Sequence, residues 1–166
     1  GIAHPAGSTW MTGTYDKALD TLYWTVGNPG PDMIGDDRLG DNLYTDSVVA
    51  LDPATGKLKW HFQFTPHDVW DYDAQETPAL VDTMWKGQPR QLLIQANRNG
   101  FFYVIDRANG KLVSAKNFVP TNWATGIDMK TGMPIETANN EKRPRLKKWA
   151  KDICPNLVGG KNWMPM

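Results

Sequence analysis

The chain has 166 residues, enough for one ordinary domain. Its 18 basic residues balance 18 acidic residues, so the net charge of zero gives no support for a nucleic-acid partner or an anionic membrane surface. No run of roughly eighteen apolar residues occurs, so no membrane span is predicted. Neither end resembles a signal peptide or a natural terminus. We therefore expect a piece of a longer protein, in which the single cysteine, Cys154, has no internal disulfide partner.

Short apolar runs, rich in β-branched and aromatic residues, recur along the chain. They cover residues 21–26, 47–51, 91–94 and 101–105, and Gly, Pro, Asn or Asp bounds most of them. This pattern is typical of strands at hairpin spacing, so we predict an all-β fold. Sustained helical periodicity appears nowhere, and the nearest helical candidate is residues 145–151, two turns at most.

An internal repeat indicates how the predicted strands are arranged. Residues 51–58 match residues 105–112, which lie 54 positions later, and residues 128–132 carry a weaker copy of the turn alone. In this turn an aspartate caps the backbone and a glycine supplies positive φ. A period of this size with several strands in each unit predicts a β-propeller. We expect about three four-stranded antiparallel blades, so residues 1–166 form a single partial β-propeller domain. The alternative is an all-β sandwich with a chance repeat.

Three aspartates, Asp68, Asp71 and Asp73, fall within six residues and alternate with aromatic residues. Carboxylates this close repel one another unless a cation or hydrogen-bond donors neutralise them. In extended structure Asp71 and Asp73 point to the same side and suit a hard, oxygen-preferring cation such as calcium. A polar loop whose aspartates cap turns is the alternative, and spacing alone leaves both open.

Other polar segments are less distinctive. Asn28 lies in an irregular loop at 27–32 that directly follows a strand, and Arg98 lies in a turn between two strand runs. In isolation the favoured interpretations are an ordinary turn for Asn28 and a surface arginine for Arg98. The basic segment at 141–151 is interpreted as a solvated excursion. Nicotinamide-binding and nucleophile-elbow glycine motifs are absent from the sequence.

Taken together, these motifs resemble the methanol and ethanol dehydrogenases that depend on pyrroloquinoline quinone (PQQ), a family of eight-bladed propellers. The repeat, with Trp60 in its first copy and Ser114 at the matching position of the second, is similar to the tryptophan-docking motif of that family. The other matching motifs follow one order along the chain, at 8–10, 27–29, 40–42, 65–68, 70–73, 98–100, 152–155 and 160–162.

The resemblance implies a cofactor site. Trp10 takes the position of the indole that stacks under the quinone ring, and Ser8 and Asn162 are further cofactor contacts. Arg98 is the catalytic donor to the reactive quinone carbonyl. The glutamate ligand and the adjacent-cysteine disulfide of this family are missing, so we expect them before Gly1, and we expect the isolated chain to be inactive.

The resemblance also implies a metal site and a reaction. Asn28, Asp71 and Asp73 are the metal ligands, and Asp71 is also the base. The implied reaction oxidises primary alcohols to aldehydes by hydride transfer to PQQ, with a calcium or lanthanide ion as Lewis acid. An aspartate at position 73 is similar to the pattern of lanthanide-using members.

The setting of the parent protein is also implied. Members of this family are periplasmic, pass electrons to a cytochrome c-type acceptor and can form homodimers. Two alternatives stay open. One is a non-enzymatic propeller scaffold of the cell envelope, which needs the repeat but has no need of Asn28, Asp71 and Arg98 together. The other is a dehydrogenase of the same chemistry that acts on sugars.

Overall fold

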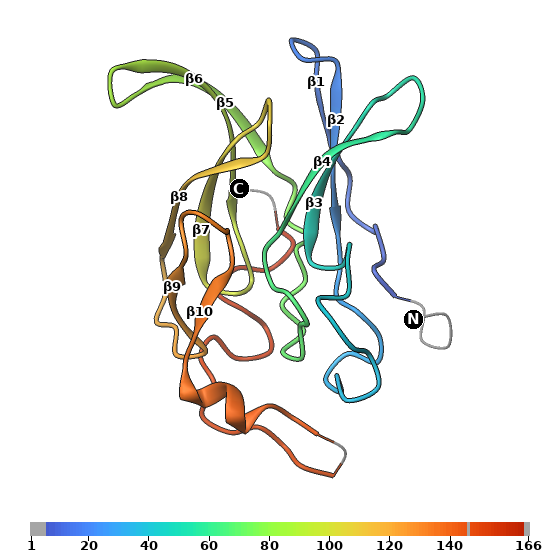
Figure 1. Ribbon diagram of the computed structural model, residues 1–166, viewed down its shortest axis with the longest axis vertical. Coiled ribbons are helices and arrows are strands. Elements are labelled where there is room, and N and C mark those ends of the chain that lie inside the picture. Colours follow the sequence, from blue (N-terminus) through green and yellow to red (C-terminus); the bar gives the residue numbers. More distant parts are fainter. Residues whose placement is uncertain (1–5, 146, 165–166) are drawn as a thin grey trace.

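The computed structural model describes residues 6–145 and 147–164, and the regular secondary structure of this part is β-strand apart from one short 3-10 helix (Figure 1). The predicted all-β fold is confirmed. The strands are β1 (Thr14–Asp16), β2 (Thr21–Val26), β3 (Ser47–Leu51), β4 (Leu58–Gln63), β5 (Ala79–Trp85), β6 (Gln88–Ala96), β7 (Phe101–Asp106), β8 (Lys111–Asn117), β9 (Ala124–Ile127) and β10 (Pro134–Glu136).

The strands form open antiparallel sheets, as expected for a partial propeller. β1 to β4 make one four-stranded sheet and β5 to β8 make a second, each in sequence order. The expected third four-stranded sheet is not present among the described residues, where β9 and β10 form a two-stranded hairpin beside β8. The reason lies in the sequence, because the third copy of the repeat retains only the turn.

The repeated turn has one geometry at all three positions. Asp52, Asp106 and Asp128 each accept the backbone N–H of the glycine four residues later at 2.8 Å. Each aspartate side chain also accepts the N–H two residues on, at 2.8 to 3.1 Å. The three glycines have φ of 71° to 77°, a region that glycine enters without strain. The weak third copy is therefore a genuine structural repeat.

Trp60 joins the first sheet to the second. Its indole N–H donates to the carbonyl of Arg107 at 3.2 Å, and a Cβ on Gly110 would lie 2.7 Å from the indole ring. The Tyr23 hydroxyl donates to the same carbonyl at 2.8 Å. The Arg107 guanidinium is ion-paired with Asp16 across the sheets at 2.6 Å. The expected tryptophan contact between blades is thus present.

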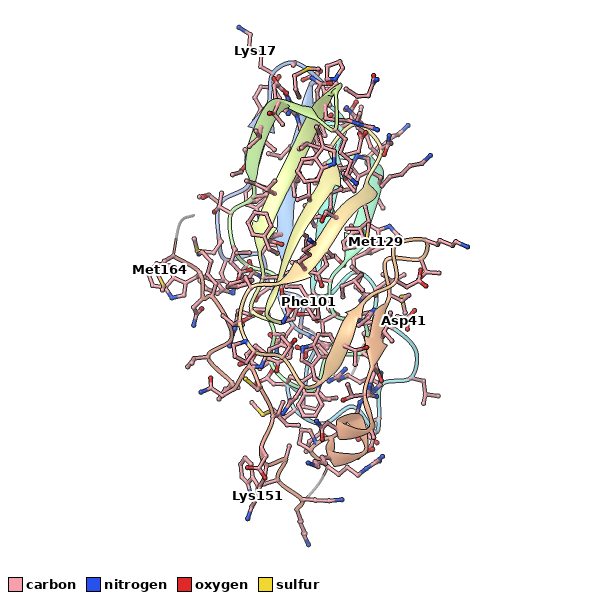
Figure 2. All side chains as sticks on the ribbon, turned by 90° about the vertical axis from the view of Figure 1, so that its left-hand side faces the viewer. Lys17, Asp41, Phe101, Met129, Lys151 and Met164 are labelled. Atoms are coloured by element: carbon pink, nitrogen blue, oxygen red, sulfur yellow. The ribbon has the colours of Figure 1, made fainter. Side chains whose placement is uncertain are left out.

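Because consecutive strands are antiparallel, the connections alternate between two ends of the molecule. The β1–β2 turn with Lys17 and the β3–β4, β5–β6 and β7–β8 turns lie at one end (Figures 1 and 2). The long connections 27–46 and 64–78 and the β6–β7 turn lie at the other end, toward Lys151 (Figures 1 and 2). The functional candidates Asn28, Asp71 and Arg98 all lie at this second end.

The segment 145–151, the nearest helical candidate in the sequence, forms no helix in its described residues. Residue 146 lies outside the described residues, and on either side of it Arg145 and Lys148 exchange backbone hydrogen bonds of 2.8 and 3.0 Å. Lys147 has φ of 65°, which is incompatible with a right-handed helix. A short 3-10 helix, η1 (Ala138–Lys142), precedes this segment instead. No helix in the described residues is long and apolar enough to cross a membrane.

Candidate active site

The turn between β6 and β7 holds Arg98 in place. The Asn97 side chain accepts the N–H of Asn99 at 3.0 Å, and the Asn99 amide donates to the Tyr103 hydroxyl at 2.9 Å. Gly100 closes the turn with φ of 94°. Arg98 is only 7% exposed, so the interpretation as a surface arginine is wrong. Sequence alone could not reveal this burial, because the covering segments are distant along the chain.

The aspartates in the connection from β4 to β5 have two different roles: one caps the backbone and two form ion pairs. Asp68 is fully buried, and its carboxylate accepts the backbone N–H groups of Trp70 at 2.9 Å and Tyr72 at 2.8 Å. The capping interpretation therefore holds for Asp68. Asp71 adopts φ of 63°, an uncommon conformation for a residue with a side chain. It belongs, with Asp73, to a separate ionic cluster.

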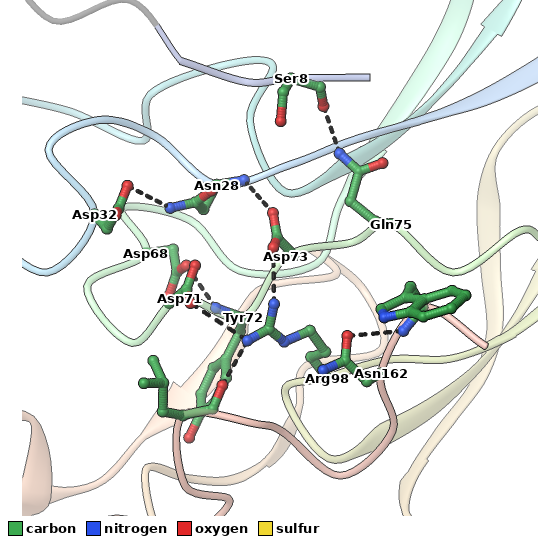
Figure 3. A network of polar contacts seen from close by, with 12 residues as sticks. Ser8, Asn28, Asp32, Asp68, Asp71, Tyr72, Asp73, Gln75, Arg98 and Asn162 are labelled. Atoms are coloured by element: carbon green, nitrogen blue, oxygen red, sulfur yellow. Dashed lines mark hydrogen bonds and ion pairs between the residues drawn. The ribbon is translucent and has the colours of Figure 1, made fainter. Parts of the chain in front are cut away.

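The Arg98 guanidinium is the centre of that cluster (Figure 3). It forms ion pairs with Asp73 at 2.7 Å and with Asp71 at 3.3 Å. It also donates to the carbonyl of Leu157 at 2.5 Å, and the Arg98 carbonyl accepts the N–H of Gly160 at 2.9 Å. The C-terminal segment thus packs directly against the arginine turn.

Asn28 enters the cluster from the β2–β3 connection. Its backbone N–H donates to Asp73 at 2.9 Å, and its side-chain amide donates to Asp32 at 3.0 Å. A Cβ on Gly27 would lie 2.5 Å from the same Asp73 oxygen, so only glycine allows this approach. The structure therefore brings Asn28, Asp71, Asp73 and Arg98 together from three separate connections.

The expected cofactor contacts lie at the margin of this cluster. The Ser8 carbonyl accepts the Gly27 N–H at 2.8 Å and a hydrogen bond from the Gln75 amide. Trp10, two residues later, is 51% exposed and makes no hydrogen bond or ring contact with the described residues. The Asn162 side chain accepts the N–H of Trp163 at 2.8 Å, just beyond the Gly160 contact with the arginine turn.

Carboxyl groups are concentrated around Arg98. Burial, together with the charges of Asp73 and Asp32, raises the pKa of Asp71 to about 6, although the Arg98 guanidinium opposes the shift. Burial raises the pKa of Asp68 to about 7 against the effect of its two backbone donors. The cluster therefore carries more carboxylates than Arg98 alone can neutralise.

The donor chemistry fits a hard cation. The described residues contain no group of three His, Cys, Asp or Glu side chains arranged for a metal. They do place two carboxylates, of Asp71 and Asp73, beside the Asn28 amide, whose oxygen accepts no hydrogen bond from a described residue. Oxygen donors of this kind suit calcium and similar ions, which take about 6–8 oxygens. An ion of this kind would need further donors beyond these three.

Several site residues have no motif that identified them. Asp32 contacts Asn28 and Gln75 contacts Ser8; Asp32 lies in the segment 27–32 noted for Asn28, whereas Gln75 lies just after the segment of Asp71 and Asp73. Buried Arg38 and Asp46 lie in the long β2–β3 connection, where no local spacing marks them. Their environment is created by residues from other connections, which a single sequence does not reveal.

Fold and site together define a class: a partial β-propeller with a carboxylate and arginine centre at one end of its blades. Residues 3–163 match the PQQ family described as "Glucose/ethanol/alcohol dehydrogenase, beta-propeller domain", so the chain belongs to this family.

Similar proteins agree with this assignment. A quinohemoprotein alcohol dehydrogenase of Comamonas testosteroni is 46% identical over 96% of the chain, which covers 22% of that protein. A lanthanide-dependent methanol dehydrogenase of Methylacidiphilum fumariolicum (strain SolV) is 41% identical over 96% of the chain and 26% of that protein. The solved structure of a europium-containing methanol dehydrogenase matches with a TM-score of 0.90 and 40% identity, covering 96% of this chain and 27% of that one. The chain thus spans about a quarter of the length of these relatives.

Proposed function

We propose that the protein containing this chain is a PQQ-dependent alcohol dehydrogenase that oxidises primary alcohols to aldehydes. The observation that carries the proposal is the joint placement of Asn28, Asp71, Asp73 and Arg98 within a PQQ-family propeller. A non-enzymatic scaffold needs the Trp60 contact but gains nothing from gathering excess carboxylates around one buried arginine.

Asp71 is the base of the proposed reaction. Its carboxylate lies beside Arg98 and is partly exposed, so it can accept the hydroxyl proton of an alcohol. Arg98 offers N–H donors to an oxygen on which negative charge builds. Bound PQQ supplies the hydride acceptor, a task for which these side chains have no chemistry of their own.

Asn28, Asp71 and Asp73 are the proposed metal ligands, and a lanthanide is the preferred ion. Attraction to an additional carboxylate scales with ionic charge, so a trivalent ion gains more from Asp73 than a divalent ion does. The lanthanide-dependent and europium-containing relatives support this choice, and calcium is the alternative ion. Trp10, Ser8 and Asn162 are the proposed cofactor contacts, with the half-exposed indole of Trp10 available to stack on a flat ring.

The proposed function also suggests a cellular location, an electron acceptor and an oligomeric state. We propose a periplasmic location, a cytochrome c-type protein as electron acceptor and a homodimeric parent. Support comes from the resemblance to the family.

The test is turnover of the full-length protein reconstituted with PQQ and either lanthanum or calcium, measured with a dye acceptor and a primary alcohol. The Asp71→Asn variant should lose activity by about 100-fold or more, because the base is removed while its shape is kept. Asp52→Asn, in an exposed turn, is the control and should keep activity. Absence of turnover by the wild-type protein with all these components would refute the proposal.

A further inference from the structure

Arg38 lies in the β2–β3 connection and is almost fully buried, with 6% of its surface exposed. Burying an arginine is costly unless its donors are satisfied. Its guanidinium donates to the Asn42 side chain at 2.6 Å, which orients it. Asn42 donates in return to the carbonyl of Arg38 at 3.2 Å. The arginine is therefore held firmly within its own connection.

The other end nitrogen of Arg38 bridges two connections. It donates to the carbonyl of Asp32 at 3.1 Å and to the carbonyl of Asp68 at 2.5 Å. Asp32 is bonded to the Asn28 side chain, and Asp68 caps the backbone of the segment that carries Asp71. One guanidinium thus links the loop of one proposed metal ligand to the loop of the other two.

Charge adds a second observation. Asp46 is fully buried, and neither of its carboxylate oxygens has a hydrogen-bond partner among the described residues. The Arg38 Nε is also buried and unpaired there. Burial lowers the pKa of Arg38, and the charges of Asp68, Asp46 and Asp32 oppose this shift. Arg38 is therefore a second buried cation close to aspartates of the two connections that it links.

We propose that Arg38 is a positioning residue that fixes the separation between the Asn28 loop and the Asp71–Asp73 loop, and through it the affinity of the site for its metal ion. The inference rests on the proposed function, since it concerns the metal site of that enzyme. Arg38 touches none of the three proposed ligands itself and acts through Asp32 and Asp68.

The experiment compares Arg38→Lys and Arg38→Met in the full-length protein. Each is freed of metal, mixed with PQQ and brought to equilibrium with terbium(III) by dialysis, and its thermal midpoint is measured separately. A lysine keeps the charge, but a single ammonium cannot reproduce three bonds from two planar nitrogens. We expect affinity for terbium to fall by about 10-fold or more, the usual effect of removing a partner that orients a metal ligand.

Arg107→Lys is the matched control. Arg107 is also a buried arginine, 3% exposed, with ion pairs to Asp16 and Asp82, but it joins the sheets far from the cluster. This variant should lower the thermal midpoint and leave terbium affinity within about twofold of wild type. If the Arg38 variants do not fold, Asn42→Ala, which removes the orienting acceptor together with the Asn42 bonds to the carbonyls of Arg38 and Leu39, carries the same expectation.

The outcomes separate the two proposals. Weaker terbium binding by the Arg38 or Asn42 variants, with the control unchanged, supports the inference. Wild-type affinity in the variants, whatever their thermal midpoint, overturns the inference and leaves the proposed function intact. A wild-type protein that binds no terbium overturns the inference and the choice of a lanthanide, and the turnover assay with calcium then decides the proposed function separately.

Discussion

Asp73 shows how a single carboxylate can serve both structure and metal choice. It is 8% exposed and accepts bonds from Asn28 and Arg98, so it does not turn outward as a loop cap. Both of its oxygens face the cluster. Its charge therefore acts on any cation held there.

We predict that Asp73→Ala in the full-length protein lowers lanthanide-supported activity by about 10-fold or more while calcium-supported activity is kept. The variant removes one negative charge, and a trivalent ion loses more attraction than a divalent ion. Activity is assayed with PQQ and each metal in parallel. Unchanged activity with lanthanum would rule out Asp73 as the residue that selects the ion.

Glu76 is another carboxyl group that lies near Asp73 and Arg98. It is fully buried, and neither side-chain oxygen is hydrogen-bonded to a described residue. Burial raises the pKa of Glu76 to about 8 from its ordinary value of 4.5. The folded state thus keeps a proton that the unfolded state releases above about pH 4.5.

The stability contributed by this proton is complete below about pH 4.5 and is lost as the pH rises through about 8. We predict that Glu76→Gln, which is neutral at every pH, gains thermal stability relative to wild type across this window, by about 1 °C or more at pH 8. Thermal midpoints measured from pH 5 to 9 test this. The exposed Glu136→Gln is the control, and an equal pH dependence in all three proteins would contradict the prediction.

Site residues could be predicted from the sequence where neighbouring residues form a recognisable motif. Spacing indicated that Asp71 and Asp73 share a side, and the resemblance added Asn28 and Arg98. Arg38, Asp46 and Glu76 were missed, because their importance arises from burial beside residues 20 or more positions away, such as Asp68 for Asp46. A buried charge leaves no periodic pattern.

At the scale of elements, the repeated turn provides its own internal comparison. Gly56 and Gly110 occupy the same position in two copies, with φ of 71° and 76°. A Cβ on Gly56 would meet nothing within 4 Å, whereas a Cβ on Gly110 would lie 2.7 Å from the Trp60 ring. A substitution to alanine would therefore strain the backbone equally at both positions. Only at Gly110 would it also disturb the contact between the two sheets.

We predict that Gly110→Ala costs about 1 kcal/mol or more of unfolding free energy beyond Gly56→Ala, because overpacking adds to the shared cost of positive φ. Denaturant unfolding of both variants measures the difference. Equal losses would show that Trp60 can move aside and that its contact contributes little.

Strand prediction succeeded where the alternation was strong. The runs at 21–26 and 47–51 coincide with β2 and β3: burial alternates along β2, where Tyr23 faces the core, and Val48 and Ala50 of β3 are fully buried. The third blade was overpredicted, since one turn motif was extended to a full unit. The nearest helical candidate, residues 145–151, forms no helix among the described residues, and the positive φ of Lys147 is incompatible with one.

At the scale of the whole molecule, the proposed metal site has few donors among the described residues. Its described residues offer three donor side chains, against the 6–8 oxygens that a calcium-like ion takes. The chain also spans only about a quarter of its relatives.

We predict that the isolated 166-residue chain shows no turnover with alcohol, PQQ and either metal in a dye-linked assay. The full-length protein in the same assay is the positive control. Clear turnover by the isolated chain would mean that these residues complete the site unaided.

The alternation of connections between two ends has a practical consequence for attaching the protein to a surface or a label. A cysteine introduced in the β3–β4 turn or at Gly87 in the β5–β6 turn lies a full strand length from the Arg98 cluster, and a tether there leaves the opposite end facing solution. A dye in the 27–46 connection would instead report every rearrangement around the carboxylates. The antiparallel strand order thus places suitable attachment positions at one end of the molecule and the proposed catalytic site at the other.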